Sequence, residues 1–202
     1  MPPNWTRSAP PCEPLEWSTE WEDERHGGWR VESAIRTDEG WTRPNLRLQM
    51  GDPERRLTGA ACVCVRHDGA HPRVLLVRQD RPAPGVRTWE LPSGMVDDDD
   101  SSPAESALRE LGEETGAQAS LVADLGEIYP DVGVFAAAVG VVVASFEFHS
   151  DDATDDDEPE VETSRWFTPE QITDLIARGE LRDGVTLAGL ALAAVHTGVR
   201  LV

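Results

Sequence analysis

The feature that most constrains this chain is a short turn motif, Glu90-Leu-Pro-Ser-Gly94, followed after an acidic loop by Arg109-Glu-Leu-Gly-Glu-Glu-Thr-Gly116. In a helix, Glu110, Glu113 and Glu114 stand at positions i, i+3 and i+4, so their carboxylates share one face. Like charges at this spacing weaken a helix by roughly a few tenths of a kcal/mol per pair. Such a cluster favours a bound cation, and oxygen-only ligands favour Mg²⁺ or Mn²⁺ over zinc.

The ends of this helix are also specified by the sequence. Ser102 is a capping residue, Pro103 suits the first helical position, and Glu105 follows three residues after the cap, which together predict a capping box. Gly116 supplies the left-handed conformation that ends a helix. Within the helix, Arg109 is expected to hold Glu113 one turn away, in a ladder that begins at Glu105.

These residues resemble the Nudix box, in which a Gly is followed by a Glu and then by Arg-Glu-hydrophobic-x-Glu-Glu-x-Gly-hydrophobic. Gly94 and the stretch from Arg109 to Ala117 match that pattern. The first half departs from it, because one residue is inserted and either Asp100 or Ser101 falls where the family has its first Glu. We expect Asp100 to substitute with a shorter reach, or the support from that Glu to be lost, with weaker metal binding as the first consequence.

The resemblance implies the Nudix fold, an α+β arrangement in which a mixed central sheet lies between helices as an α/β/α sandwich. The run Val74–Arg81 and the tail from Val161 to Gly184 are similar to the ADP-ribose pyrophosphatase branch of the family. On this basis residues 57–202 form the hydrolase domain, and residues 1–56 form an N-terminal arm and small β extension. In that branch the extension builds a homodimer, so a homodimer is expected here.

Roles for individual residues follow from the resemblance. Glu110, Glu113 and Glu114 are expected to bind the metal together with the carbonyl of Ser93, and Glu113 is also placed among the catalytic residues. Supporting positions in the box are Gly94, Asp100, Arg109 and Gly116.

Substrate contacts are expected on the strand before the box. Arg81, and with less support Arg78, carry planar donors that suit phosphate oxygens, and Glu90 is grouped with them. The base that activates water is expected in the acidic loop before the last strand, at Glu158 or Glu160; such an acidic run also has an ordinary explanation as a solvated loop.

The charge balance limits the partners. The chain has 18 basic and 38 acidic residues, a net charge of −20, and no Lys. Nucleic acid and anionic membranes are therefore not expected as partners, and a polyanionic substrate needs local arginines and bound metal. The first fourteen residues contain no apolar core of a signal peptide, and the three cysteines fit a reducing compartment, so a cytoplasmic location is expected.

Hydrophobic patterning predicts a series of strands and two further helices outside the box. The strands are expected at Trp29–Arg36, Trp41–Gln49, Leu57–Arg66, Val74–Arg81, Val86–Leu91, Ala119–Ile128, Phe135–Phe148 and Val161–Phe167. The helices are expected at Pro169–Arg178, capped by Thr168, and at Gly184–His196, capped near Asp183.

Three functions remain open at this stage. The leading one is a Mg²⁺-dependent pyrophosphohydrolase of a nucleoside diphosphate-linked compound, most simply ADP-ribose cleaved to AMP and ribose 5-phosphate. Another conjugate such as a nucleotide sugar stays open, because the apolar stretch Val134–Ala138 stands where relatives that cleave ADP-ribose carry polar groups. The other two are a non-catalytic nucleotide-binding or sensing module and an acidic interaction protein that uses the fold as a scaffold.

Overall fold

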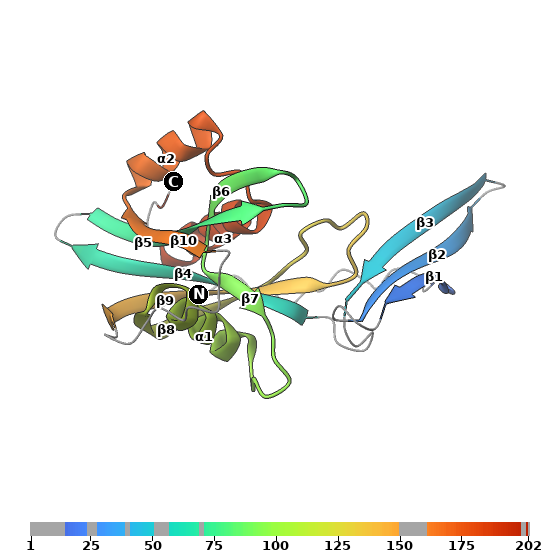
Figure 1. Ribbon diagram of the computed structural model, residues 1–202, viewed down its shortest axis with the longest axis horizontal. Coiled ribbons are helices and arrows are strands. Elements are labelled where there is room, and N and C mark those ends of the chain that lie inside the picture. Colours follow the sequence, from blue (N-terminus) through green and yellow to red (C-terminus); the bar gives the residue numbers. More distant parts are fainter. Residues whose placement is uncertain are drawn as a thin grey trace. The chain divides into compact units, whose positions relative to one another are not determined.

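The computed structural model describes residues 15–23, 28–38, 41–50, 57–68, 71–149, 161–198 and 201 (Figure 1). The chain divides into two compact units, with the boundary between Pro53 and Glu54. Each unit is described by itself below.

The N-terminal unit contains a three-stranded antiparallel sheet in the order β1-β2-β3. Its strands are β1 (Ser18–Asp23), β2 (Trp29–Asp38) and β3 (Trp41–Gln49). The sequence predicted β2 and β3. It did not predict β1, because its polar residues show no apolar alternation and the strand is defined by pairing with β2.

The larger unit contains a mixed sheet whose main path runs β10-β5-β4-β9-β8, with β6 paired to β5 and β7 paired to β4. The pair β4–β9 is parallel and the other pairs are antiparallel. The strands are β4 (Leu57–Asp68), β5 (His71–Arg81), β6 (Val86–Glu90), β7 (Ser93–Met95), β8 (Ala117–Ile128), β9 (Ala138–His149) and β10 (Val161–Phe167). The helices are α1 (Pro103–Thr115), α2 (Pro169–Arg178) and α3 (Gly184–Thr197).

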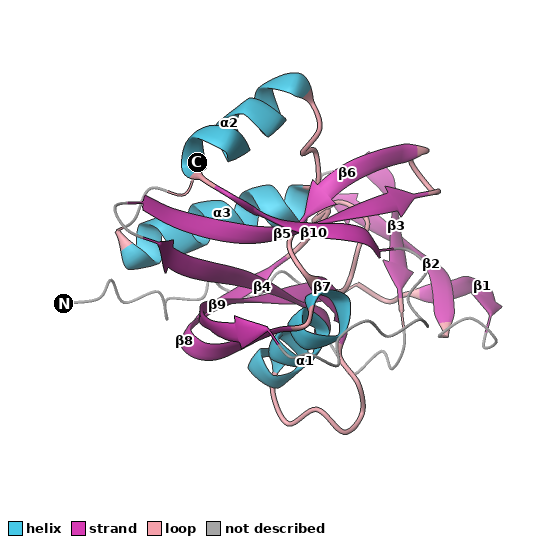
Figure 2. Cartoon of the chain, turned by 60° about the vertical axis from the view of Figure 1, so that its left-hand side comes forward, coloured by secondary structure: helices cyan, strands magenta, loops and turns pink. Residues whose placement is uncertain are grey.

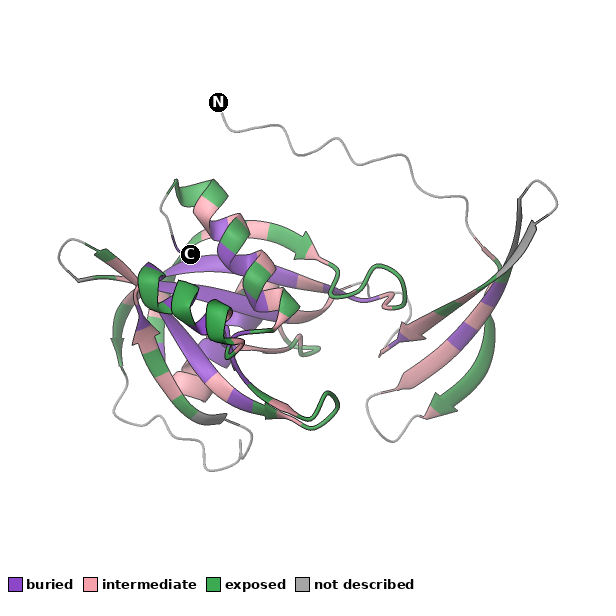
Figure 3. Cartoon of the chain, turned by 90° about the horizontal axis from the view of Figure 1, so that it is seen from above, coloured by how far each residue is buried: buried purple, intermediate pink, exposed green. Residues whose placement is uncertain are grey.

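Helices cover both faces of this sheet, α1 on one side and α2 with α3 on the other (Figure 2). Strand β4 has apolar residues on both faces. Val63 packs with residues of α2 and α3, and its neighbours Cys62 and Cys64 pack with residues of α1. This alternation follows from the period of two in a strand. Figure 3 shows the buried residues along the central strands. The predicted α/β/α sandwich is confirmed.

The cysteines of β4, Cys62 and Cys64, are buried free thiols. Burial raises the pKa of Cys64 to about 12. Both side chains therefore act as small apolar groups of the core at neutral pH.

Helix α1 begins and ends as the sequence predicted, with one difference at its start. Ser102 Oγ accepts a hydrogen bond from the backbone N–H of Glu105 (3.2 Å), and Gly116 ends the helix with φ = 70°. The carboxylate of Glu105, however, accepts the N–H of Ser101 (2.8 Å), one residue before the cap. The predicted capping box is therefore not closed, and the ladder expected from Glu105 begins at Arg109.

Strand β9 starts later than predicted, at Ala138 in place of Phe135. The residues before it form a turn, in which Asp131 Oδ1 accepts the N–H of Gly133 (2.8 Å) and its carbonyl accepts the N–H of Phe135 (2.9 Å). An Asp at this position competes locally with strand pairing, which apolar patterning alone does not reveal.

Candidate active site

The acidic face of α1 lies against the turn that contains Ser93 and Gly94. Pairing of β7 with β4, with Gly94 opposite Ala60, fixes this turn on the sheet. A Cβ atom at Gly94 would lie well inside 3.0 Å of the carboxylate of Glu110. Glu110 is buried there, with 7% of its surface exposed. Because Gly94 has no side chain, the carboxylate of Glu110 can occupy this space.

The carboxylate of Glu114 is held by two N–H donors from other elements. Its Oε2 accepts the backbone N–H of Ser93 (3.1 Å), and its Oε1 accepts Nε2 of Gln79 on β5 (2.7 Å). Hydrogen bonds to an ionised carboxylate are among the stronger ones in proteins. Glu114 is thus oriented by both the turn and the sheet.

Arg109 supplies the counter-charge for the other two carboxylates. Its Nη1 lies 2.9 Å from Glu110 Oε1 and 2.7 Å from Glu113 Oε2. The expectation that Arg109 holds Glu113 is confirmed. The same side chain also donates from Nη2 to the carbonyl of Met95 (3.0 Å), which ties the helix to the end of β7.

Asp100 forms a further ion pair with Arg109. Its Oδ2 lies 3.1 Å from Arg109 Nη2 and accepts hydrogen bonds from Ser106 Oγ (2.7 Å) and from the N–H of Asp97 (3.0 Å). Ser101, the other residue that could fall at the box Glu position, contacts Glu105. Asp100 therefore reaches the helix despite the inserted residue.

These contacts make Asp100 an acid-sensitive support of α1. The hydrogen bonds from Arg109 and Ser106, in that order, lower the pKa of Asp100 to about 2. Because the folded pKa lies below the unfolded value of about 3.9, the stabilisation is complete above about pH 4 and is lost as the pH falls toward 2. We expect Asp100→Asn to lower the melting temperature at pH 7 and to lose this difference near pH 2.

Calorimetric or circular-dichroism melts at pH 7, 5, 3 and 2 measure this effect. Asp99→Asn, at an exposed position in the same loop, is the control and should leave the melting temperature unchanged. A difference between Asp100→Asn and the parental protein that persists undiminished at pH 2 contradicts the assignment.

The donor set of this site suits a divalent cation in its chemistry. Carboxylate oxygens are the ligands of Mg²⁺ and Mn²⁺. As the side chains lie, no group of three or more His, Cys, Asp or Glu residues in the described part of the chain is arranged to hold an ion. Glu110 and Glu113 are instead paired with Arg109, and Glu113, with 40% of its side chain exposed, has room to turn away from it.

A cleft beside the acidic face is lined by residues of β5, β6 and the start of α3. Its volume is about 690 Å³, and its lining includes Arg81, Thr88, Glu90, Arg182 and Asp183. The backbone N–H of Arg182 donates to Thr88 Oγ1 (3.1 Å), which fixes the segment before α3 on β6.

Within the cleft, Arg81 and Glu90 form a bidentate ion pair. Arg81 Nη2 lies 2.6 Å from Glu90 Oε2, and Arg81 Nε lies 3.1 Å from Glu90 Oε1. Burial raises the pKa of Glu90 above its ordinary value, against the lowering effect of Arg81. The pair therefore holds one buried carboxylate and one partly exposed guanidinium in a fixed orientation.

The structure separates Arg78 from this arrangement. Its guanidinium carbon lies 5.8 Å from the ring centroid of Trp89, which packs in the core beneath α2 and α3. Strand alternation explains this, since Arg81 and Arg78 are an odd number of residues apart. Glu158 and Glu160 lie outside the described residues.

Sequence reasoning missed two residues of the site, Gln79 and Arg182. Gln79 lies two residues before Arg81, so strand alternation could have placed it on the same face. Arg182 reaches the cleft only because the segment before α3 docks on β6. No local sequence pattern predicts this docking.

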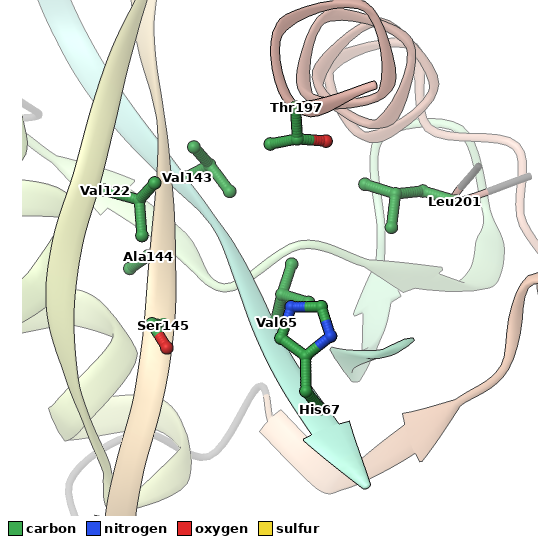
Figure 4. A pocket seen from close by; sticks show the side chains of 8 residues that line it. All are labelled: Val65, His67, Val122, Val143, Ala144, Ser145, Thr197 and Leu201. Carbon is green, nitrogen blue, oxygen red and sulfur yellow. The ribbon is translucent and has the colours of Figure 1, made fainter. Parts of the chain in front are cut away.

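A second, small pocket lies elsewhere on the sheet, lined by Val65, His67, Val122, Val143, Ala144, Ser145, Thr197 and Leu201 (Figure 4). Its lining is mainly apolar and contains no carboxylate. His67 lies six residues along β4 from Ala61, the partner of Ser93, which is about 20 Å at the rise of a strand. This pocket is therefore separate from the acidic site.

No helix in the described part of the chain combines the length and the apolar character needed to cross a membrane.

Comparison with known proteins gives consistent matches. The NUDIX domain model matches residues 55–189. ADP-ribose pyrophosphatase of Mycobacterium tuberculosis (strain ATCC 25618 / H37Rv) is 31% identical over 148 residues, which cover 69% of this chain and 67% of that protein. CMP-5'-(N-acetyl-N-hydroxy-3-aminopropyl)phosphonate hydrolase of Streptomyces rubellomurinus (strain ATCC 31215) is 29% identical over 143 residues, 71% of this chain and 66% of that protein. The chain thus spans about two thirds of the length of each relative.

The fold is also found among solved structures. A crystal structure of an ADP compounds hydrolase matches with a TM-score of 0.69 and 21% identity, over 91% of this chain and 92% of that chain. At this identity the match shows a shared fold.

Proposed function

Since this chain belongs to the NUDIX family and is a pyrophosphatase-type hydrolase, we propose that it is a Mg²⁺-dependent pyrophosphohydrolase of a nucleoside diphosphate-linked compound, with ADP-ribose as the leading substrate. The products are then AMP and ribose 5-phosphate. Mn²⁺ is the alternative cation.

One observation carries this proposal: carboxylates suited to a metal and an arginine suited to phosphate are connected through one strand. Gln79 bonds Glu114 at 2.7 Å, and Arg81 follows two residues later on the same face of β5, about 7 Å along the strand. A diphosphate needs charge neutralised on its oxygens on both sides of the scissile bond. The spacing supports a substrate that lies between α1 and the cleft.

Each residue then has a defined task. Glu110, Glu113 and Glu114, with the Ser93 carbonyl, would hold the cation, which supplies charge neutralisation and orientation of the phosphate oxygens when bound. Arg81 would bind phosphate, held in place by Glu90. When the metal binds, Glu113 would turn from Arg109 to the metal. Asp100 would still hold the guanidinium of Arg109 in place through their ion pair.

We propose that the base that activates water is Glu158 or Glu160, as the resemblance to the family implies. A large loss of kcat in only one of Glu158→Gln and Glu160→Gln would identify it.

The direct test is hydrolysis of ADP-ribose, a nucleotide sugar, a diadenosine polyphosphate and a dinucleotide cofactor, each with Mg²⁺ and with excess chelator, followed by chromatography. We expect AMP and ribose 5-phosphate from ADP-ribose with Mg²⁺ and a loss of nearly all turnover with chelator, because the carboxylates alone leave the diphosphate charge unneutralised. Turnover that survives the chelator contradicts the metal role. No turnover of any compound, with metal binding measured separately, favours a sensing module.

A different nucleotide conjugate is the second candidate substrate. The S. rubellomurinus relative is named for a CMP conjugate. In this chain an exposed apolar residue, Val134, begins the stretch Val134–Ala138, which stands where relatives that cleave ADP-ribose carry polar groups. Faster hydrolysis of a CMP-linked or sugar-linked compound than of ADP-ribose in the same panel would establish this alternative.

We also propose a homodimer formed through the N-terminal sheet. The strand pairings put Trp21, Ile35 and Leu46 on one face of that sheet, and each is at least half exposed. Exposed apolar side chains gathered on one face of a sheet favour association with a partner. The odd cysteine count and the buried thiols of β4 support the cytoplasmic location expected for such an enzyme.

Light scattering after gel filtration tests the dimer. The parental protein is expected at twice its chain mass, and Ile35→Asp combined with Leu46→Asp is expected at one chain mass, since two charges cannot be buried in an apolar interface. Asn45→Asp, on the opposite face of β3, is the control that stays dimeric. A monomeric parental protein rules the dimer out.

A further inference from the structure

Gln79 is a buried polar residue with one half of its amide engaged. Only 3% of its surface is exposed, and its Nε2 donates to Glu114 Oε1 at 2.7 Å. Its Oε1 is also buried and accepts no hydrogen bond from any of the described residues. Buried polar atoms are paired in the great majority of cases, so this oxygen requires an explanation.

The chemistry of Glu114 fixes which end of the amide is unsatisfied. An ionised carboxylate only accepts hydrogen bonds. The reversed amide would set two oxygens against each other at the same 2.7 Å separation. The unsatisfied atom is therefore the carbonyl oxygen, an acceptor that needs a donor.

Packing alone does not call for an amide at this position. Leu75 and Val77 precede Gln79 on the same face of β5 and are buried apolar residues. A buried acceptor without a donor costs free energy that an apolar side chain of the same size avoids. The cost is offset if a donor arrives with the ligands of the site.

We propose that Gln79 is a positioning residue for Glu114 and that its Oε1 accepts a hydrogen bond from an O–H group brought by the ligands, either a water of the cation's hydration shell or a hydroxyl of the substrate. The amide thereby connects the acidic face of α1 to the strand that carries Arg81. This inference rests on the proposed metal site.

The test is titration calorimetry on Gln79→Met, which keeps the length of the side chain and removes both polar atoms. Mn²⁺ alone is titrated first, and AMP is titrated second at saturating Mn²⁺. Loss of an outer-sphere partner weakens metal binding by about 10–100-fold, so we expect Mn²⁺ affinity to fall at least about tenfold. The melting temperature without metal should stay near the parental value, because the substitution also removes the unsatisfied oxygen.

The AMP titration separates the sources of the donor. Loss of the Nε2 bond to Glu114 weakens Mn²⁺ binding in either case. AMP affinity that is unchanged at saturating Mn²⁺ then supports a hydration water, and at least tenfold weaker AMP binding supports a substrate hydroxyl. Gln118→Met, at an exposed position of β8, is the matched control and should change neither affinity. Gln79→Leu is the second variant if Met overpacks the site.

Two results overturn the inference, and they differ in what they reject. Parental affinities for both Mn²⁺ and AMP in a folded Gln79 variant reject the role of Gln79 and leave the metal site intact. Absence of Mn²⁺ binding by the parental protein rejects the metal site itself.

Discussion

Replacement of Glu114 by Gln is expected to lower kcat/KM for the proposed diphosphate substrate at least about 100-fold, since loss of a residue that merely supports a metal ligand already costs 10–100-fold. The side chain keeps its size and loses the charge that would hold the cation. Because Glu114 is only partly buried, the melting temperature should change little. Initial rates with Mg²⁺, together with a Mn²⁺ titration and a thermal melt, measure all three quantities.

The control for this substitution is Glu170→Gln in the first turn of α2, an exposed Glu away from the acidic face. It makes the same chemical change and should leave kcat/KM unaltered. Parental activity in Glu114→Gln would remove Glu114 from the metal site, and an unfolded variant would show that the residue is structural.

Replacement of Gly94 by Ala is expected to affect both stability and activity. The added methyl group would overlap the buried carboxylate of Glu110. Overpacking costs up to about 1–3 kcal/mol in the free energy of unfolding, and this is an upper bound here because the carboxylate ends a flexible side chain. Relief requires Glu110 to leave its position beside the turn. Because Glu110 is a proposed metal ligand, we also expect kcat/KM to fall at least about tenfold. Urea unfolding and steady-state rates measure the two effects.

Gly112→Ala provides the matched control within α1. Its Cβ would meet the side-chain amide of Gln118 at 3.3 Å, a flexible group that can move aside. Alanine in a helix interior is favoured over glycine by about 1 kcal/mol, so stability should be equal or higher with activity retained. If Gly94→Ala behaves in the same way as Gly112→Ala, then close approach of Glu110 to the turn is not needed.

The fold was largely predictable because its signals are local. The cap at Ser102, the left-handed Gly116 and the three acids at helical spacing all act within a few residues, and α1 forms as expected. Val63 and Cys64 face opposite sides of the sheet, which likewise follows from the geometry of a single strand. The failures at β1 and at the start of β9 occur where pairing partners or an Asp turn outweigh apolar patterning.

The candidate site was predictable in its residue types and not in its contacts. The sequence placed Glu110, Glu113 and Glu114 on one face and proposed Arg109 as a partner, and both are present in the structure. It left Asp100 and Ser101 as alternatives for the missing Glu. The folded loop decides between them, because it brings Asp100 onto Arg109 and turns Ser101 toward Glu105.

The sequence by itself therefore determined the acidic helix, its ends, the alternation of the strands and the family. Only the tertiary structure decided what orients the carboxylates and the arginine. The donors to Glu114 come from Ser93 and Gln79, 21 and 35 residues away, and the Arg81–Glu90 pair joins two strands. Such contacts depend on strand register and on how a helix packs against the sheet, and these are set by the burial of many side chains together.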